Sequence, residues 1–322
     1  MFVISGAKIV KNDKMKQSNK ICIEKVNFTP INAKKTIMKQ TSLVIIIFLL
    51  SLLAESSNAQ KKNSAEPYFF IQISDPQFGM LESNNGFEKE TYYYERAVKE
   101  INRLKPDFVL ITGDLVNKKG DKSQIAEFKR ITGNINHDIP VYVSPGNHDI
   151  GQAPEQKDID AFKAEYGYDR IAFKHKGSLF IGINSNIIKA NTPVLEQQQF
   201  KWLKKELSKG KSSKNIVIFC HHPFFKNAFD EPEVYFNIGT ETRNKYLALF
   251  KEYNVDAIFA GHLHDNGFAR YGNLEMVTTS AVGMPLSKPS SGIRIVKVYS
   301  NRLESDFYGL TDIPESVILQ DN

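Results

Sequence analysis

The chain has 322 residues, of which 41% are hydrophobic and 24% are charged, as in an ordinary soluble globular protein. Its net charge of +6 comes from residues 1–59, which carry nine Lys and three acidic residues and leave 33 of the 42 basic and 33 of the 36 acidic residues elsewhere. This neutral balance beyond residue 59 argues against a nucleic-acid-binding function.

The first segment of the chain has the pattern of an export signal. Residues 1–37 precede Met38, are rich in Lys, and are interpreted as a non-native or upstream extension. Lys39 then supplies a positive charge, residues 43–53 an apolar stretch, and Ser57-Asn58-Ala59 a small-x-small cleavage site. We therefore predict a signal peptide over residues 38–59, a short linker over 60–66 and one domain over 67–322.

An uncleaved membrane anchor is the alternative interpretation of this segment. Its apolar stretch has 11 residues, whereas a helix needs roughly 20 to span a bilayer. We therefore expect cleavage near Ala59, no membrane span in the mature chain, and an exported protein that is periplasmic or extracellular.

Beyond the linker, apolar runs alternate with amphipathic stretches. Strands are predicted at 68–74, 107–114, 141–147, 171–173, 179–184, 215–220 and 256–261, and helices at 91–104, 124–132, 159–166, 195–210 and 242–254. Four short β segments follow, at 268–272, 274–280, 292–300 and 303–309. Alternating helices and strands followed by consecutive strands indicate an α/β sandwich with mixed sheets in one domain.

Polar side chains that can bind a metal ion lie at the carboxyl end of five of these strands or directly after it. They are Asp75 and Gln77; Asp114; Asn147, His148 and Asp149; His221 and His222; and His262 and His264. Ligands in open α/β sheets bind beyond the carboxyl ends of the strands, and unpaired buried carboxylates there would be costly. The pattern therefore indicates a cation site, where Gly261 is expected to let the backbone turn sharply.

The chemistry of these side chains favours particular metals. Carboxylate, amide and imidazole ligands together suit Mn, Fe, Zn or Ni better than Ca, which prefers oxygen ligands only. Cys220 is the one cysteine beyond residue 59, which excludes both an internal disulfide and a thiolate zinc site. Seven candidate ligands exceed the needs of one tetrahedral ion and suit two ions that share a carboxylate.

Five short motifs occur in a fixed order along the chain. They are DPQ from Asp75, GDLVN from Gly113, GNHD from Gly146, HHP from His221 and GHLH from Gly261. In this order they resemble the calcineurin-like metallophosphoesterase superfamily, over roughly residues 68–300. SDPQFG and GDLVN are similar in particular to the subgroup of the calcineurin-like phosphoesterase domain-containing serine/threonine phosphatase. The resemblance implies a four-layer α-β-β-α sandwich with two mixed β-sheets.

The resemblance also implies roles for the motif residues. Asp75, Gln77 and His264 would hold a first metal ion, Asn147, His221 and His262 a second, and Asp114 would bridge both. A bridging hydroxide would attack phosphorus, while His148 stabilises the developing charge and protonates the leaving group. Asn147, His148 and His222 are predicted to contact substrate, and Asp149 to support catalysis by orienting a neighbouring histidine or helix start.

Two positions depart from the family pattern. Gln77 stands where most relatives have His, which would loosen the first metal site or shift its preference toward Mn or Mg. Asn117 stands where many relatives have an Asp that pairs with the catalytic His, which would leave His148 less basic or supported by another carboxylate.

The sequence therefore predicts an exported phosphoesterase that uses two divalent ions (Mn, Fe, Zn, Ni or Mg) to hydrolyse a phosphorylated substrate, a phosphate monoester. A phosphodiesterase or nucleotide pyrophosphatase at the same site is the alternative, because the ions would handle the phosphoryl group common to all three. A binding or adhesion protein with a degenerate site is a third hypothesis, which the presence of Asp114, Asn147 and His148 disfavours. Phe224, Phe225 and Phe236 are predicted either to form a substrate wall or to pack in the core.

Overall fold

The computed structural model describes residues 66–286 and 291–320, all within one compact unit, Lys62–Asn322. The predicted upstream extension, the predicted signal peptide and all of the predicted linker except Glu66 lie outside the described residues. Among the helices that the structure describes, none is long and apolar enough to cross a membrane.

One mixed sheet is built around three parallel strands. The strands β1 (Tyr68–Ile73), β2 (Val109–Thr112) and β3 (Val141–Ser144) lie side by side in that order and run in the same direction. Two antiparallel strands, β10 (Gly292–Val298) and β11 (Leu303–Gly309), extend the sheet beyond β1. The carboxyl ends of β1, β2 and β3 therefore meet at one edge.

The second mixed sheet has four parallel strands in its centre. They are β5 (Ser178–Gly182), β6 (Ile216–Phe219), β7 (Ala257–Ala260) and β9 (Leu274–Thr278). Antiparallel strands close both sides, β4 (Ile171–His175) beside β5 and β8 (Gly267–Tyr271) beside β9. The central strands are buried along their whole length apart from Glu275 in β9, as expected for parallel strands covered on two faces.

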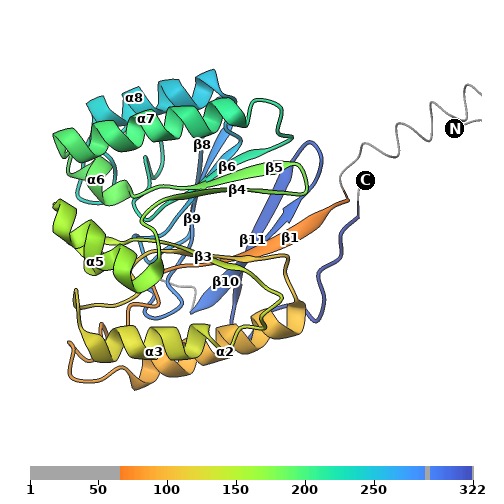
Figure 1. The fold of residues 1–322 in the computed structure, drawn as a ribbon. Helices are drawn as coiled ribbons and strands as arrows, with labels where there is room; N and C mark the ends of the chain where they lie inside the picture. Colours follow the sequence, from red (N-terminus) through yellow and green to blue (C-terminus); the bar gives the residue numbers. More distant parts are fainter. Residues whose placement is uncertain (1–65, 287–290, 321–322) are drawn as a thin grey trace, which may run out of the picture. The chain divides into compact units, whose positions relative to one another are not determined.

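The two sheets pack face to face through an aromatic core. The ring of Phe70 on β1 lies 5.5 Å from the ring of Phe180 on β5 and 5.6 Å from that of Phe259 on β7, both edge-on. Helices α2 (Glu88–Leu104) and α3 (Lys122–Thr132) pack on the first sheet, while α5 (Gln156–Tyr166) contributes Phe162 to this core and Ile159 to the core of the second sheet. Helices α7 (Pro193–Lys209) and α8 (Thr240–Glu252) cover the second, which confirms the four-layer α-β-β-α sandwich (Figure 1).

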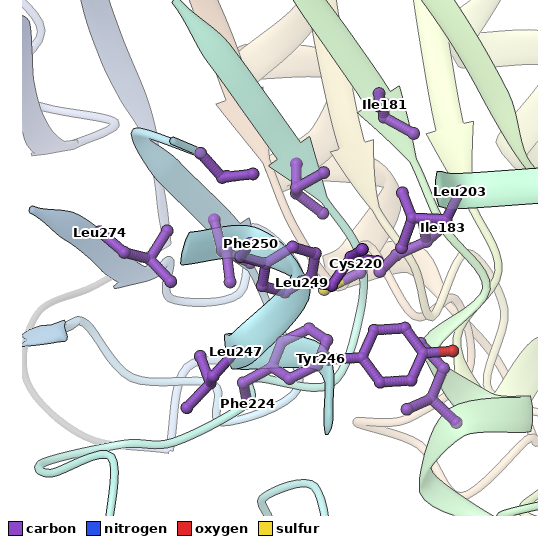
Figure 2. Close-up of a cluster of buried hydrophobic side chains, with 14 of the residues drawn as sticks. Ile181, Ile183, Leu203, Cys220, Phe224, Tyr246, Leu247, Leu249, Phe250 and Leu274 are labelled. Carbon is purple, nitrogen blue, oxygen red and sulfur yellow. The ribbon is translucent and has the colours of Figure 1, made fainter. Parts of the chain in front are cut away.

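The core beneath α7 and α8 settles one open point of the sequence analysis. Phe224 is fully buried and packs against the rings of Tyr246 and Phe250 on α8 (Figure 2). Phe225 is also fully buried in this cluster. Both side chains therefore belong to the core and cannot form a substrate wall.

Two short helices were not expected from the sequence. They are α4 (Asn147–Ile150), directly after β3, and α6 (Ser185–Lys189), shortly after β5. Helices of four and five residues are too short to show a hydrophobic period of 3.6 residues. Because α4 begins at Asn147, the strand predicted over 141–147 ends three residues earlier, at Ser144.

Candidate metal centre

The structure brings all seven predicted metal ligands together at one end of the sandwich. Asp75 and Gln77 follow β1, Asp114 follows β2 and Asn147 follows β3, all from the first sheet. His221 follows β6, and His262 and His264 follow β7, in the second sheet. Hydrogen bonds from the His221 ring to the Thr112 carbonyl oxygen and from the His262 backbone N–H to Asp75 join the two sheets here.

Several potential ligand atoms crowd around one nitrogen of His221. Its Nδ1–H donates to the Thr112 carbonyl oxygen at 2.9 Å, which turns Nε2 toward the site. Nε2 lies 3.0 Å from Asn147 Oδ1, 3.2 Å from Asp114 Oδ2 and 3.1 Å from His262 Nδ1. A single imidazole N–H can satisfy only one of these lone-pair atoms, so the arrangement fits a shared cation.

A second group of ligand atoms surrounds Asp75. The ring of His264 donates through Nδ1–H to the Met284 carbonyl oxygen and presents Nε2 at 3.4 Å from Asp75 Oδ1. Asp75 Oδ2 already accepts hydrogen bonds from Ser74 and from the His262 backbone. Asp75 Oδ1 and Gln77 Oε1 are buried and have no hydrogen-bond partner among the described residues. Such orphaned acceptors are costly without a cation.

Asp114 belongs to both groups. Its carboxylate forms one group with His221 and His262 and another with Asp75 and His264, and the ligand atoms of each group lie within 4.8 Å of one another. Burial would raise the pKa of Asp114, but His221 and His148 outweigh it and hold that pKa below its usual value. The donor set therefore fits divalent metal binding around a shared carboxylate.

The charge on His221 is linked to these carboxylates. Burial would lower the pKa of His221, but Asp114 and then Asp75 raise it to about 9. A metal ion that takes the same Nε2 lone pair must displace this proton, because only the neutral ring is a ligand. The carboxylates that favour a proton on His221 are therefore the same groups that would favour a metal ion there.

Left-handed backbone conformations are concentrated in this site. Asp75, Gln77, Asp114, His262 and His264 have φ angles of 50°, 41°, 48°, 69° and 49°. Non-glycine residues rarely adopt positive φ, and such conformations cluster where a site requires them. The strands therefore turn at the ligands themselves, which directs these side chains over the strand ends.

Gly261 serves a different purpose from the one expected. It has no positive φ; the turn occurs at His262 instead. A Cβ atom on residue 261 would lie 1.8 Å from Ser74 Oγ and 2.5 Å from Asp75 Oδ2. Glycine is thus needed because the chain passes directly against the Asp75 carboxylate, and the expectation of a glycine turn was wrong.

His148 lies beside the ligands on the one-turn helix α4. Its backbone N–H donates to Asp114 Oδ1 at 2.8 Å, and its Nδ1–H donates to the backbone carbonyl oxygen of Asn117 at 2.7 Å. The Asn117 main chain therefore orients this ring, a contact that any side chain at residue 117 would permit. The ring leaves Nε2 available to carry a second, mobile proton.

Comparison with known proteins identifies the family. The calcineurin-like phosphoesterase family matches residues 70–266, more than half of the chain. The chain belongs to this family. It is 32% identical over 276 residues to the rat (Rattus norvegicus) serine/threonine-protein phosphatase CPPED1, covering 80% of this chain and 88% of the relative. The predicted family and subgroup are therefore confirmed.

Two further comparisons extend this result. The probable glycerophosphodiester phosphodiesterase GpdQ of Arcobacter nitrofigilis is 29% identical over 202 residues, covering 60% of this chain and 71% of the relative. The structure of purple acid phosphatase PPD1 from yellow lupin (Lupinus luteus) matches with a TM-score of 0.57 and 14% identity, over 77% of this chain and 52% of that chain. This structural match supports the fold alone. The family match, the likeness to the phosphatase CPPED1 and the two groups of ligand atoms together show that this calcineurin-like phosphoesterase is an enzyme, a phosphoric ester hydrolase.

Asp149 contacts backbone in this phosphoesterase, not a histidine ring. Its Oδ1 accepts hydrogen bonds from the backbone N–H groups of Leu115 and Val116, at 2.9 and 3.3 Å, and its Oδ2 accepts one from that of Gly146, at 2.7 Å. The carboxylate therefore ties the start of α4 to the segment after Asp114. Of the two supporting roles predicted for it, these contacts favour the orientation of a helix start.

His222 is completely enclosed. It is 1% exposed, and its ring lies 4.3 Å from that of His262 and 5.1 Å from that of His221. Burial and then the two neighbouring imidazoles hold the pKa of His222 well below its usual value, so the ring is neutral. This burial favours packing behind the ligands, and contact of His222 with substrate stays a prediction.

Two aromatic side chains flank the site at the surface. The rings of Tyr235 and Phe236 lie 5.4 and 6.1 Å from the ring of His262, and the side chains are 56% and 46% exposed. Glu231 and Asn237 pin their loop through hydrogen bonds to its backbone. Phe236 was predicted from the sequence as a candidate substrate contact, whereas Tyr235 was missed, although its place after the HHP motif was an available signal.

Proposed function

We propose that this phosphoesterase hydrolyses phosphate monoesters with the help of two divalent ions. The observation that carries the proposal is the Asp114 carboxylate, which takes part in both groups of ligand atoms. The likeness to serine/threonine-protein phosphatase CPPED1, which spans most of both chains, supports a monoester substrate. The donor set supports Mn, Fe, Zn, Ni or Mg as the ions.

The ligands divide into two groups in this proposal. Asp75, Gln77 and His264 would hold one ion, and Asn147, His221 and His262 the other, with Asp114 between them. When bound, such ions would supply an activated water molecule and neutralise charge on the phosphoryl oxygens. The protein's own part is to hold the imidazole rings in place. The backbone carbonyl oxygens of Thr112, Met284 and Asn117 accept hydrogen bonds from the rings of His221, His264 and His148, respectively.

Proton transfer is assigned to His148. Because Nδ1–H is engaged by the Asn117 carbonyl oxygen, the mobile proton of the imidazolium is at Nε2. Donation of this proton to the ester oxygen would let the alcohol leave without a full negative charge. The half-buried position of His148 at the start of α4 leaves the ring accessible to a substrate.

Hydrolysis of phosphodiesters is a second candidate activity, favoured by the likeness to the probable glycerophosphodiester phosphodiesterase of Arcobacter nitrofigilis. We expect the monoester p-nitrophenyl phosphate to give a higher kcat/KM than bis-p-nitrophenyl phosphate after metal-stripped protein is reloaded with Mn, Zn, Mg or Ni. A higher kcat/KM for the diester would reverse the order of the two candidates. Activity that survives complete metal removal would reject both.

We also propose that the protein is exported. The motifs that support this are Lys39, the apolar stretch 43–53 and the small-x-small sequence ending at Ala59. Expression in a host with a secretory pathway should yield a mature chain whose N-terminal residue is Gln60. N-terminal sequencing of cellular and exported fractions would measure this, and a chain that remains in the cell with residues 38–59 attached would contradict it.

A further inference from the structure

Four amide side chains form a continuous chain of hydrogen bonds that ends in the candidate metal centre. Gln77 is linked to Asn117, Asn117 to Asn84, and Asn84 to Gln124. We call these residues the amide chain. Gln77 and Gln124 at the two ends are 1% and 2% exposed, whereas the hydrogen bond between Asn117 and Asn84 in the middle is exposed.

Backbone N–H groups set the orientation of the Gln124 amide, at the end of the amide chain that lies away from the candidate metal centre. The N–H groups of Asn117 and Lys118 both donate to Gln124 Oε1, at 3.1 and 2.9 Å. Since an amide oxygen only accepts and an amide nitrogen only donates, Gln124 must present its Nε2 to the next residue. That nitrogen donates to Asn84 Oδ1 at 2.9 Å.

The same logic passes along the chain to Gln77. Asn84 Oδ1 also accepts from Asn117 Nδ2 at 2.9 Å, which leaves Asn117 Oδ1 as the acceptor for Gln77 Nε2 at 3.2 Å. Gln77 Oε1 is then left buried and without a partner among the described residues. The backbone N–H of Gln77 donates to the backbone carbonyl oxygen of Asp114. Gln77, which carries the unpartnered Oε1, is therefore bonded directly to the residue that supplies the shared carboxylate.

The backbone around the amide chain makes room for it. Gly79 has φ +98°, and a Cβ atom there would lie 2.4 Å from Gln124 Nε2 and 3.1 Å from Asn84 Oδ1. Asn84 itself has φ +67°, and its backbone N–H donates to the Gly79 carbonyl oxygen at 2.7 Å. The tight turn over residues 79–84 thus holds the middle of the chain in place.

We infer that the amide chain positions Gln77 to bind a metal ion through Oε1, and that Asn117 is the positioning residue on which this depends. The inference rests on the proposed metal-dependent function and concerns the ion held by Asp75 and His264. A freely rotating Gln77 amide would present its NH₂ group to that ion in part of its conformations. Fixing the amide removes this repulsive arrangement.

The test measures metal affinity without any substrate. Purified full-length protein, stripped of metal, is titrated with Mn²⁺ in competition with a coloured chelator. We expect Asn117→Leu to weaken one of two Mn²⁺ equivalents by about 10- to 100-fold, as loss of a residue that orients a ligand typically does. The other equivalent, at His221 and His262, should keep its affinity.

Variants at residue 84 separate positioning from general damage. Asn84→Asp keeps an oxygen that accepts from both Asn117 and Gln124, and should bind both equivalents as the parent does. Asn84→Gly tolerates the positive φ but removes that acceptor, and should weaken the same equivalent as Asn117→Leu. Asn102→Leu is the matched control. Asn102 lies near the end of α2 and also makes two side-chain hydrogen bonds, but to the backbone of residues 134 and 136, which follow α3.

Two results would overturn the inference. One is unchanged affinity for both equivalents in Asn117→Leu and Asn84→Gly. The other is equal weakening of both equivalents together with a loss of metal-free thermal stability, which would mark a folding defect. Failure of the proposed function would instead appear as no hydrolysis by the parent protein, whatever its metal affinities.

Discussion

Replacing Asp114 with Asn is expected to lower kcat/KM for phosphate esters by about three orders of magnitude, or roughly 4 kcal/mol of transition-state stabilisation. The retained amide oxygen can still accept from the His148 backbone N–H, as Asp114 Oδ1 does. The other oxygen, Oδ2, lies 3.2 Å from His221 Nε2. In the variant it becomes an NH₂ group, which cannot bind a cation. Metal content after dialysis and kcat/KM would measure the two losses.

Asp107→Asn is a suitable control for this variant. Asp107 also accepts from an imidazole, His175 Nε2 at 2.8 Å, and from Lys176, but it precedes β2 whereas Asp114 follows that strand. This control should bind metal and hydrolyse esters as the parent does. An Asp114→Asn enzyme with parental, chelator-sensitive activity would show that the shared carboxylate is unnecessary and would refute the two-ion proposal.

The fold was accessible from the sequence because its elements are long enough to show their periods. The stripe of Ala97 and Ile101 on α2 is buried against the first sheet, and Leu203 and Leu207 on α7 are buried against the second. The parallel strands appear as short, mainly apolar runs because both faces are covered. One-turn helices such as α4 and α6 carry no such period, and these were missed.

The location of the candidate site followed from the same logic. Asp75, Asp114 and Asn147 each follow a parallel strand of one sheet, so their convergence is a consequence of topology. His221 and His262 follow neighbouring parallel strands of the other. The sequence could not show how closely the edges of the two sheets approach each other. At this approach Gly261 is necessary, because a Cβ atom there would collide with Ser74 and Asp75.

Contacts made by main-chain atoms and by loop amides could not be predicted. From the sequence, Asn117 in place of an Asp was expected to leave His148 less basic or supported by another carboxylate. In the structure, the backbone carbonyl oxygen of Asn117 makes the contact with the His148 ring. The Asn117 side chain instead reaches Gln77 and Asn84. Asn84 and Gln124 follow no strand, so their polarity looked like ordinary surface composition, and only three-dimensional proximity reveals them as a connected set.

His148→Ala is expected to reduce activity in a manner that depends on the leaving group. An alkyl phosphate such as β-glycerophosphate, whose alkoxide is strongly basic, should lose about 10²- to 10⁴-fold in kcat, the usual contribution of a general acid. For p-nitrophenyl phosphate the loss should be much smaller, because p-nitrophenolate leaves readily without a proton. Comparison of kcat for the two substrates measures the effect.

The metal content of His148→Ala distinguishes loss of the proton donor from damage to the ligands. The His148 side chain contacts the Asn117 carbonyl oxygen, while its link to Asp114 is through the backbone N–H, which alanine retains. Both metal equivalents should therefore bind as in the parent, and an exposed-histidine variant, His137→Ala, should match the parent throughout. An equal loss on both substrates would mean that His148 binds the phosphoryl group and does not deliver the proton at Nε2.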